Sequence, residues 1–160
     1  MKKLFLILFV AVLLAGCNGL VSPRPIPAVN GSPIVIANNK LDLSNQNLTK
    51  VPEYVFNLTK LEELNLSNNQ LTGAIQSQIG QLKKLKVLNA SDNFMTGVPA
   101  EVGQLINLQV LDLSDNQLTG LPNELGNLKN LQTFNISGNN YSAQDLNGII
   151  QKIPNANVIK

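Results

Sequence analysis

Residues 113–128 read LSDNQLTGLPNELGNL, and residues 90–105 repeat the pattern as ASDNFMTGVPAEVGQL. A third version, LSNNQLTGAIQSQIGQL, begins at Leu66. An Asn, a Thr-Gly pair and a Gly-x-Leu step recur in these stretches. Self-similarity at a period of about 20 to 50 residues is the signature of stacked repeat proteins. The stretch therefore predicts a solenoid made from one repeated unit.

The repeats align on a leucine that recurs every 23 or 24 residues. These leucines are Leu61, Leu85, Leu108 and Leu131, and a weaker copy begins at Asn38. From each leucine the chain follows LxxLxLxxNxL or a close variant of it. This pattern resembles the leucine-rich repeat, with about five copies over residues 38–153.

The resemblance implies an α/β leucine-rich-repeat solenoid, with a parallel β-sheet on the concave face and short helical or 3₁₀ segments on the convex face. The alternation in LxL suits a strand that is buried on one side, and Phe134 takes the place of a core leucine. Residues 142–145 read SAQD, which has the S-x-x-D form of a helix start. We therefore expect a C-terminal capping helix over residues 143–152.

Three residue types have expected structural roles within each repeat. An asparagine amide can donate to and accept from backbone groups that a turn leaves unpaired. Gln46 takes this place in the first copy, where we expect the ladder to be weakest. The ladder asparagines are Asn69, Asn93, Asn116 and Asn139; the turn glycines are Gly73, Gly97 and Gly120; Pro52, Pro99 and Pro122 start the outer segments.

The first residues predict export and lipid attachment. Lys2 and Lys3 precede an unbroken apolar run over residues 4–15, which is short for a membrane span of about 20 residues. Residues 14–17, LAGC, resemble the lipobox of bacterial lipoproteins. The resemblance implies diacylglycerol on the Cys17 thiol and cleavage just before it. The alternatives are an ordinary secretory signal followed by a chance cysteine, or an uncleaved anchor.

The chain therefore divides into a lipoprotein signal peptide (residues 1–16), a Pro-rich tether (17–33) and a leucine-rich repeat domain (34–160). Prolines at positions 23, 25, 27 and 33 favour extended backbone in the tether. At about 3.1 Å per residue, about 20 residues reach on the order of 60 Å. The apolar residues 34–36 either fold back as a cap on the first repeat or continue the spacer.

Composition argues against several classes of function. The chain has no histidine and one cysteine, so it lacks the usual general base and cannot form an internal disulfide or a cysteine-based zinc site. We expect no cofactor, no metal and no enzyme, although a Ser-Lys or paired-Asp site stays open. Without Lys2 and Lys3 the basic and acidic residues balance at ten each, which argues against a nucleic-acid partner. A solvated face explains the cluster Lys83, Lys84 and Lys86.

The solvent-facing strand positions are the expected binding surface. The more variable ladder is Lys40, Glu63, Val87, Val110 and Thr133; the next includes Asn89 and Asp112, which are either binding or repeat-bracing residues. Phe94 replaces a glutamine at the rim of the inner face, where it either anchors a partner or packs locally against Met95.

These features predict a membrane-anchored, extracytoplasmic leucine-rich-repeat module. Exported across the cytoplasmic membrane, it would be lipid-anchored through Cys17 to the cell membrane or the outer membrane of a bacterium. Its expected partner is another protein, with a glycan as the second option, bound through the concave face. The alternative is a passive structural or assembly lipoprotein of the envelope without a specific ligand.

Overall fold

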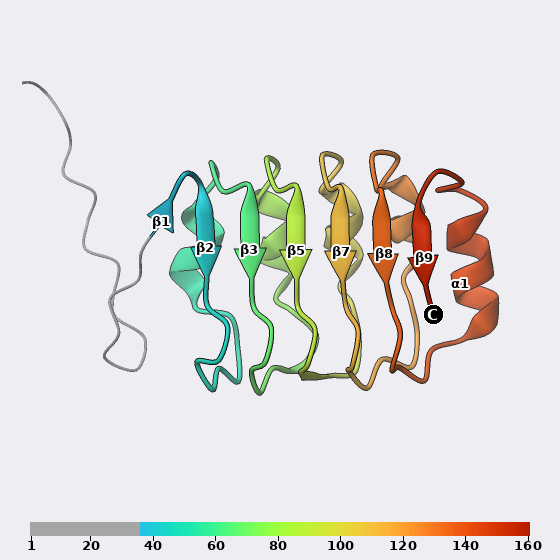
Figure 1. Cartoon of the computed structure of the whole chain (residues 1–160), viewed down its shortest axis with the longest axis horizontal. Coiled ribbons are helices and arrows are strands. Elements are labelled where there is room, and N and C mark those ends of the chain that lie inside the picture. The colour runs from blue at the N-terminus through green and yellow to red at the C-terminus, as the bar shows by residue number, and fades with distance from the viewer. Residues whose placement is uncertain (1–35) are drawn as a thin grey trace, which may run out of the picture.

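The computed structural model describes residues 36–160 of the chain. Seven strands form one sheet in the order β1-β2-β3-β5-β7-β8-β9, laid side by side along the long axis (Figure 1). Strand β1 runs antiparallel to β2, and the six others are parallel. The bounds are β1 Ile36–Ala37, β2 Lys40–Asp42, β3 Glu63–Asn65, β5 Val87–Asn89, β7 Val110–Asp112, β8 Thr133–Asn135 and β9 Asn157–Ile159.

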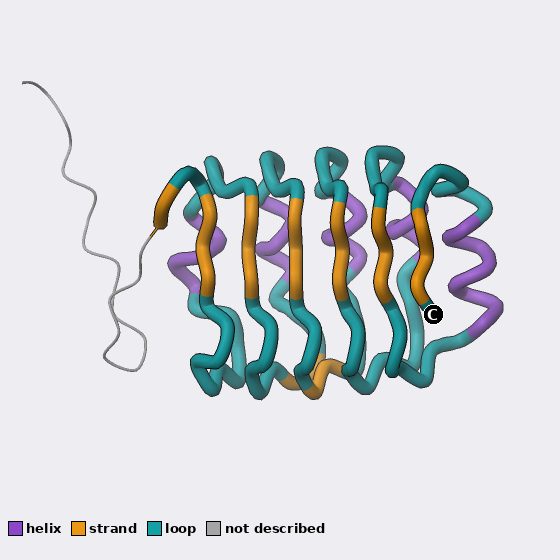
Figure 2. Tube along the Cα trace, in the orientation of Figure 1, coloured by secondary structure: helices purple, strands orange, loops and turns teal. Residues whose placement is uncertain are grey.

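The opposite face carries short helices, as Figure 2 shows in purple. Four are 3₁₀ helices: η1 Glu53–Asn57, η2 Ser77–Gln81, η3 Ala100–Gln104 and η4 Asn123–Asn127. Three of them follow a proline whose fixed φ starts the segment in extended backbone, and Gln76 replaces the proline before η2. The predicted leucine-rich-repeat solenoid with 3₁₀ segments on its convex face is confirmed.

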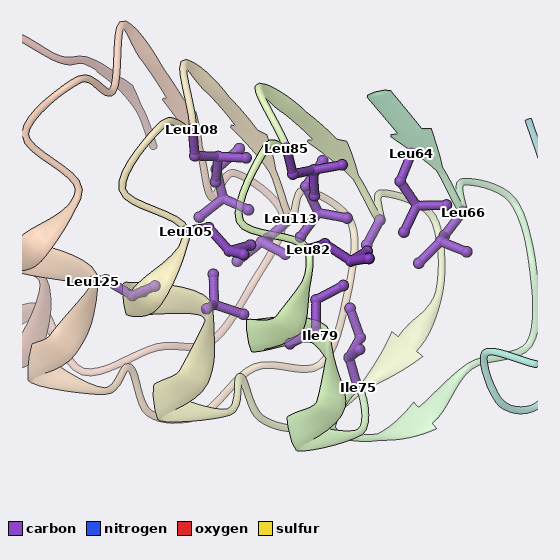
Figure 3. Packing of buried hydrophobic residues seen from close by; sticks show 14 of the residues in the cluster. Leu64, Leu66, Ile75, Ile79, Leu82, Leu85, Leu105, Leu108, Leu113 and Leu125 are labelled. Atoms are coloured by element: carbon purple, nitrogen blue, oxygen red, sulfur yellow. The ribbon is translucent and has the colours of Figure 1, made fainter. Parts of the chain in front are cut away.

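The core fills the space between the sheet and the 3₁₀ helices. The middle residue of each of the strands β2, β3, β5, β7 and β8 is fully buried, whereas its two neighbours face solvent or are half-buried. Leucines of the strands, such as Leu64, and apolar residues of the convex segments, such as Ile79 and Leu125, belong to one buried cluster (Figure 3). Burying one such side chain is worth about 1.5–3 kcal/mol, so the regular core supplies most of the stability. Phe134 is fully buried, as predicted.

The sharp turn after each strand depends on a left-handed residue. The φ angle is positive at Asn45, Asn68, Asp92, Asp115 and Gly138, one position in every repeat. Asn, Asp and Gly adopt this conformation at low cost. The predicted turn role of the glycines holds only for Gly73 and is wrong for Gly97 and Gly120, because their φ angles are not positive.

A second, two-stranded parallel sheet lies on the edge that follows the main strands. It pairs β4 (Thr72–Gly73) with β6 (Phe94–Met95). In Figure 2 it is the short strand pair at the lower edge, beyond the carboxyl ends of the main strands. This sheet gives Phe94 its position.

The two ends of the solenoid are covered differently. At the first repeat, Ile36 and Ala37 pair with Leu41 and Lys40, so this part of residues 34–36 folds back onto the domain. Residues 34 and 35 lie outside the described residues, as do the signal peptide and the tether.

At the other end, helix α1 (Ala143–Ile150) is two residues shorter than the predicted 143–152. The Ser142 hydroxyl accepts a hydrogen bond from the Asp145 amide (3.2 Å), as the S-x-x-D pattern predicts. The tail adds β9, a sixth parallel strand, where the sequence predicted five repeats and a closing tail. Three residues after a proline are too short to show a strand period.

Close packing of adjacent convex segments requires glycine at position 103. A Cβ atom there would lie 2.6 Å from the Glu124 carbonyl carbon in η4, whereas one on Gly97 would meet only the Ala74 Cβ at 4.0 Å. We expect Gly103→Ala to lower the free energy of unfolding by about 1–3 kcal/mol, because backbone must move, and Gly97→Ala to change it little. Urea unfolding of both variants measures the difference. Equal stabilities would contradict the packing.

Candidate binding surface

Strand register aligns the first predicted ladder on the concave face. Lys40 pairs with Glu63, Glu63 with Val87, and Val87 with Val110. Thr133 and Asn157 extend the same row to the last strand. We call this row the first column. Its residues come from separate repeats and are brought together by the parallel sheet alone.

The chemistry of the first column changes along the solenoid. Lys40 Nζ lies 2.6 Å from Glu63 Oε1, and both side chains remain well exposed. Such a surface pair contributes little stability, so its charges stay available to a partner. Val87 and Val110 follow as two half-buried apolar residues, and Thr133 and then Asn157 complete the row with a hydroxyl and an amide.

A hollow of about 350 Å³ opens over the first strands of this face. Its solvent-facing lining is Lys40, Asp42, Glu63, Asn65, Val87 and Asn89, and its floor is Leu41 and Leu64. The hollow could not be predicted from the sequence, because it arises from the shape of the stacked strands and no single repeat encodes it. The Lys40–Glu63 ion pair and Val87 therefore line the same hollow.

The second ladder is the row Asp42, Asn65, Asn89, Asp112 and Asn135, and each of its side chains forms the same structural hydrogen bond. In each repeat an Asp or Asn Oδ1 accepts the backbone N–H of the serine two residues later, at 2.9–3.3 Å. Asp112 also accepts from the Ser114 hydroxyl and, through Oδ2, from Asn135 Nδ2 (3.2 Å). Asn89 contributes only its carbonyl oxygen to these bonds. Asp112 is therefore a bracing residue, and Asn89 keeps donor capacity beside the hollow.

Phe94 does not belong to the concave sheet. It lies on β6 next to Thr72 of β4, and its side chain is 50% exposed. Met95, the next residue, is buried at 1%. Because neighbouring strand residues point to opposite sides, the Phe94 side chain lies on the opposite side of β6 from the buried Met95, with half of its surface exposed.

The asparagine ladder ties each repeat to the one before it. Asn116 Nδ2 donates to the carbonyls of Leu113 (3.2 Å) and Ser114 (3.0 Å) and, across the repeat boundary, of Ala90 (2.9 Å). Its Oδ1 accepts the Met95 N–H at 3.0 Å. Asn69, Asn93 and Asn139 make the same kind of contacts, and Asn69 Oδ1 accepts both the Gln46 and Leu48 N–H groups.

Residues 36–160 contain neither a cluster of metal ligands nor a membrane-spanning helix. Within that range no group of three or more Cys, Asp or Glu residues is placed to hold a metal ion. The same part of the chain contains no helix with the length and apolar character needed to cross a bilayer. Cys17, the predicted lipidation site, lies outside the described residues.

Comparison with known proteins decides the family. A family model described as "Leucine-rich repeat region" matches residues 39–151. The chain belongs to the leucine-rich repeat family. No curated protein matches it.

Several solved leucine-rich repeat structures are similar. A Leptospira interrogans leucine-rich repeat protein is 38% identical with a TM-score of 0.71, over 75% of this chain and 30% of that one. The ectodomain of the Arabidopsis thaliana receptor kinase SOBIR1 is 33% identical (TM-score 0.62; 74% and 65% covered). The Arabidopsis GASSHO1/SCHENGEN3 ectodomain, solved with CASPARIAN STRIP INTEGRITY FACTOR 2, is 30% identical (0.65; 74% and 14%).

The chain thus spans 30% of the Leptospira protein and 65% of the SOBIR1 ectodomain. Its fold is that of a protein–protein interaction module.

The buried amides generate a stability prediction. We expect Asn93→Ala and Asn116→Ala each to lower the free energy of unfolding by about 1–3 kcal/mol, because each leaves buried backbone groups unpaired. Gln117→Ala removes an exposed side chain next to Asn116 and should change stability by less than about 0.5 kcal/mol. Chemical denaturation of the three variants measures this, and equal effects would refute the role of the amides.

Proposed function

We propose that this leucine-rich repeat protein is a lipid-anchored recognition module outside the cytoplasm, which binds a partner protein through its concave sheet. The main evidence is the contrast between the second ladder and the first column, two neighbouring rows of residues on the concave face. The second ladder is committed to backbone hydrogen bonds in every repeat. The first column has no such bond and varies from charge pair to valine to threonine.

The hollow supports the same surface. It joins the Lys40–Glu63 pair to Val87, so one opening offers a cation, an anion and an apolar wall. A peptide or a protein loop presents the same three chemistries, whereas a neutral glycan would leave both charges unmatched. The GASSHO1/SCHENGEN3 ectodomain, solved with its named factor, supports a protein partner by analogy.

The size of the sheet limits the affinity. Six parallel strands about 4.8 Å apart give a width on the order of 25 Å. The usable face is below the roughly 800 Å² per partner of a standard interface. Binding through this face alone is therefore weak, and display of many copies on one membrane raises the effective concentration.

Membrane display is the role that we assign to Cys17. A single fatty chain holds a protein only marginally, whereas the two chains of a diacylglycerol hold it stably. Eighteen residues separate Cys17 from Ile36. Extended at about 3.1 Å each, they reach on the order of 60 Å, which leaves the domain free to meet partners.

Photo-crosslinking in living cells tests the concave face. A benzophenone amino acid at Val87 should give a discrete protein adduct, because Val87 lines the hollow. The same probe at Gln78, an exposed residue of the convex η2 helix, should give none. Mass spectrometry of the adduct identifies the partner.

Two other adduct patterns would contradict the proposal or favour its alternative. Equal adducts from both probes would contradict recognition by the concave sheet. Adducts from Val87 only to other copies of this chain would favour the passive assembly role instead.

Lipid attachment has a separate test. Cells fed a clickable fatty acid should label the protein, and Cys17→Ser should abolish the label because the chain has no other cysteine. Gel fluorescence of the purified chain measures it, with Lys50→Gln as a matched unaffected variant. Labelling that survives Cys17→Ser would refute the anchor.

A further inference from the structure

Four β-turns line up on the edge that precedes the strands. They span residues 58–61, 82–85, 105–108 and 128–131, and each is closed by an i→i+3 backbone hydrogen bond of 2.8–3.1 Å. They lie among the loops at the top of Figure 1, and we call this row the turn edge. The two central residues of each turn are exposed: Thr59 and Lys60, Lys83 and Lys84, Ile106 and Asn107, Lys129 and Asn130.

The turn edge is basic and largely uncompensated. Its eight central residues include four lysines and no carboxylate. Within residues 36–160 the two ion pairs are Lys40–Glu63 and, just behind the edge, Lys86–Glu62 at 2.5 Å. The Lys83 and Lys129 ammonium groups bond only neutral oxygens, on Gln104 (2.9 Å) and the Lys152 carbonyl (2.6 Å).

Glu62 directly follows the first turn of this edge. Its hydrogen bond to Lys86, the Lys86 charge and, more weakly, the Lys84 charge lower the pKa of its carboxyl group. Glu62 is therefore ionised at neutral pH and largely matched by Lys86, which leaves the turn lysines in excess.

The opposite edge is acidic. Asp92 and Asp115 occupy the left-handed turn positions that follow the strands, and Asp42 and Asp112 end strands β2 and β7. The described residues hold nine lysines and ten carboxylates, so their formal charge is close to balance. Four lysines nevertheless lie at the centres of the turn edge and these four aspartates lie toward the other edge, so charge is distributed unevenly along the strand direction.

An apolar side chain stands within the basic row. Ile106 is 58% exposed, more than any other large hydrophobic residue described, and its turn lies between those of Lys83 and Lys129. The row is held in line from behind, because Asn107 Nδ2 donates to the Lys83 carbonyl and Asn130 Nδ2 to the Ile106 carbonyl, both at 2.8 Å. The side chains project from a braced backbone.

We propose that the turn edge docks on an anionic lipid bilayer, with its four lysines against phosphate headgroups and Ile106 at the interface. Clusters of four to eight basic residues next to a membrane recognise anionic lipids, and each lysine strengthens the contact about fivefold. Ile106 distinguishes this surface from one that only binds a soluble polyanion. The proposal rests on the proposed anchor for delivery to the membrane, although docking itself is a property of residues 58–131.

Docking sets the orientation of the domain. The strands stand upright on the membrane, and the acidic edge and Phe94 point away from it. The concave face then looks sideways, with the hollow unobstructed.

The test is photo-crosslinking to lipid with the full chain reconstituted into vesicles. The vesicles are phosphatidylcholine alone, or with about one third phosphatidylglycerol. A benzophenone amino acid replaces Ile106, and Gln117 on the opposite edge carries the control probe. We expect lipid adducts at Ile106 on anionic vesicles, reduced at least tenfold without phosphatidylglycerol or at about 1 M salt, where the screening length falls to about 3 Å.

Matched charge variants separate the turn edge from net charge. Lys83→Gln with Lys84→Gln should reduce the Ile106 adduct by about tenfold or more, since two lysines are lost. Lys50→Gln with Lys160→Gln removes the same charge elsewhere and should leave it within about twofold. Equal losses, equal adducts at Ile106 and Gln117, or adducts to a second copy in place of lipid would overturn the docking proposal.

Vesicle flotation distinguishes docking through the turn edge from anchoring through Cys17. A chain that floats with phosphatidylcholine vesicles but gives no Ile106 adduct on anionic ones retains its anchor and overturns docking. A chain that floats only with anionic vesicles and gives the adduct supports docking and overturns the anchor.

Discussion

The structure depends on one buried interaction, the asparagine amide that joins each repeat to the one before it. The Asn116 amide donates hydrogen bonds to backbone carbonyls of two repeats and accepts one from a backbone N–H of the preceding repeat. A turn that leaves a strand and enters a core would otherwise bury unpaired backbone groups, each costing about 1–3 kcal/mol. Because the same bonds recur at Asn69, Asn93 and Asn139, they hold successive strands in one register.

The structural roles within each repeat limit the positions that can carry a binding function. Within each repeat the strand centre must be apolar, the turn must tolerate positive φ, and the second ladder must accept a serine N–H. Positions without these structural roles include the first column and the centres of the turns. The turn centres hold Thr-Lys, Lys-Lys, Ile-Asn and Lys-Asn, while the leucines around them do not change. Both of these surfaces can therefore vary without disturbing the fold, and they are the two assigned to partners.

Sequence analysis reached the solenoid, the 3₁₀ segments and the first column because each leaves a mark inside a single repeat. The tight turn was assigned to Gly97 and Gly120, whereas the positive φ angles lie at Asp92 and Asp115, because Asp and Asn also adopt that conformation and sequence alone does not show where they do. Strand β9 could not be predicted, because its three residues are too short to show a period. The lysines of the turn edge were seen only as Lys83, Lys84 and Lys86, because Lys60 and Lys129 become neighbours of that cluster only when repeats stack. The binding roles of the first column, Phe94 and Cys17 stay predictions.

Contact through the turn edge would lower the entropic cost of binding a partner through the first column. Binding a partner costs translational and rotational freedom, and a sheet on the order of 25 Å wide offers few contacts to offset that cost. Under the proposed anchor, the 18 residues between Cys17 and Ile36 would keep the domain near a membrane without setting its orientation. Contact through the turn edge would remove most of the domain's rotation before a partner arrives, because a row of lysines from residues 60 to 129 resists rocking along the solenoid axis. The hollow beside Lys40 and Val87 would then meet a second membrane-bound protein in one orientation, so a small interface suffices where in free solution it would not.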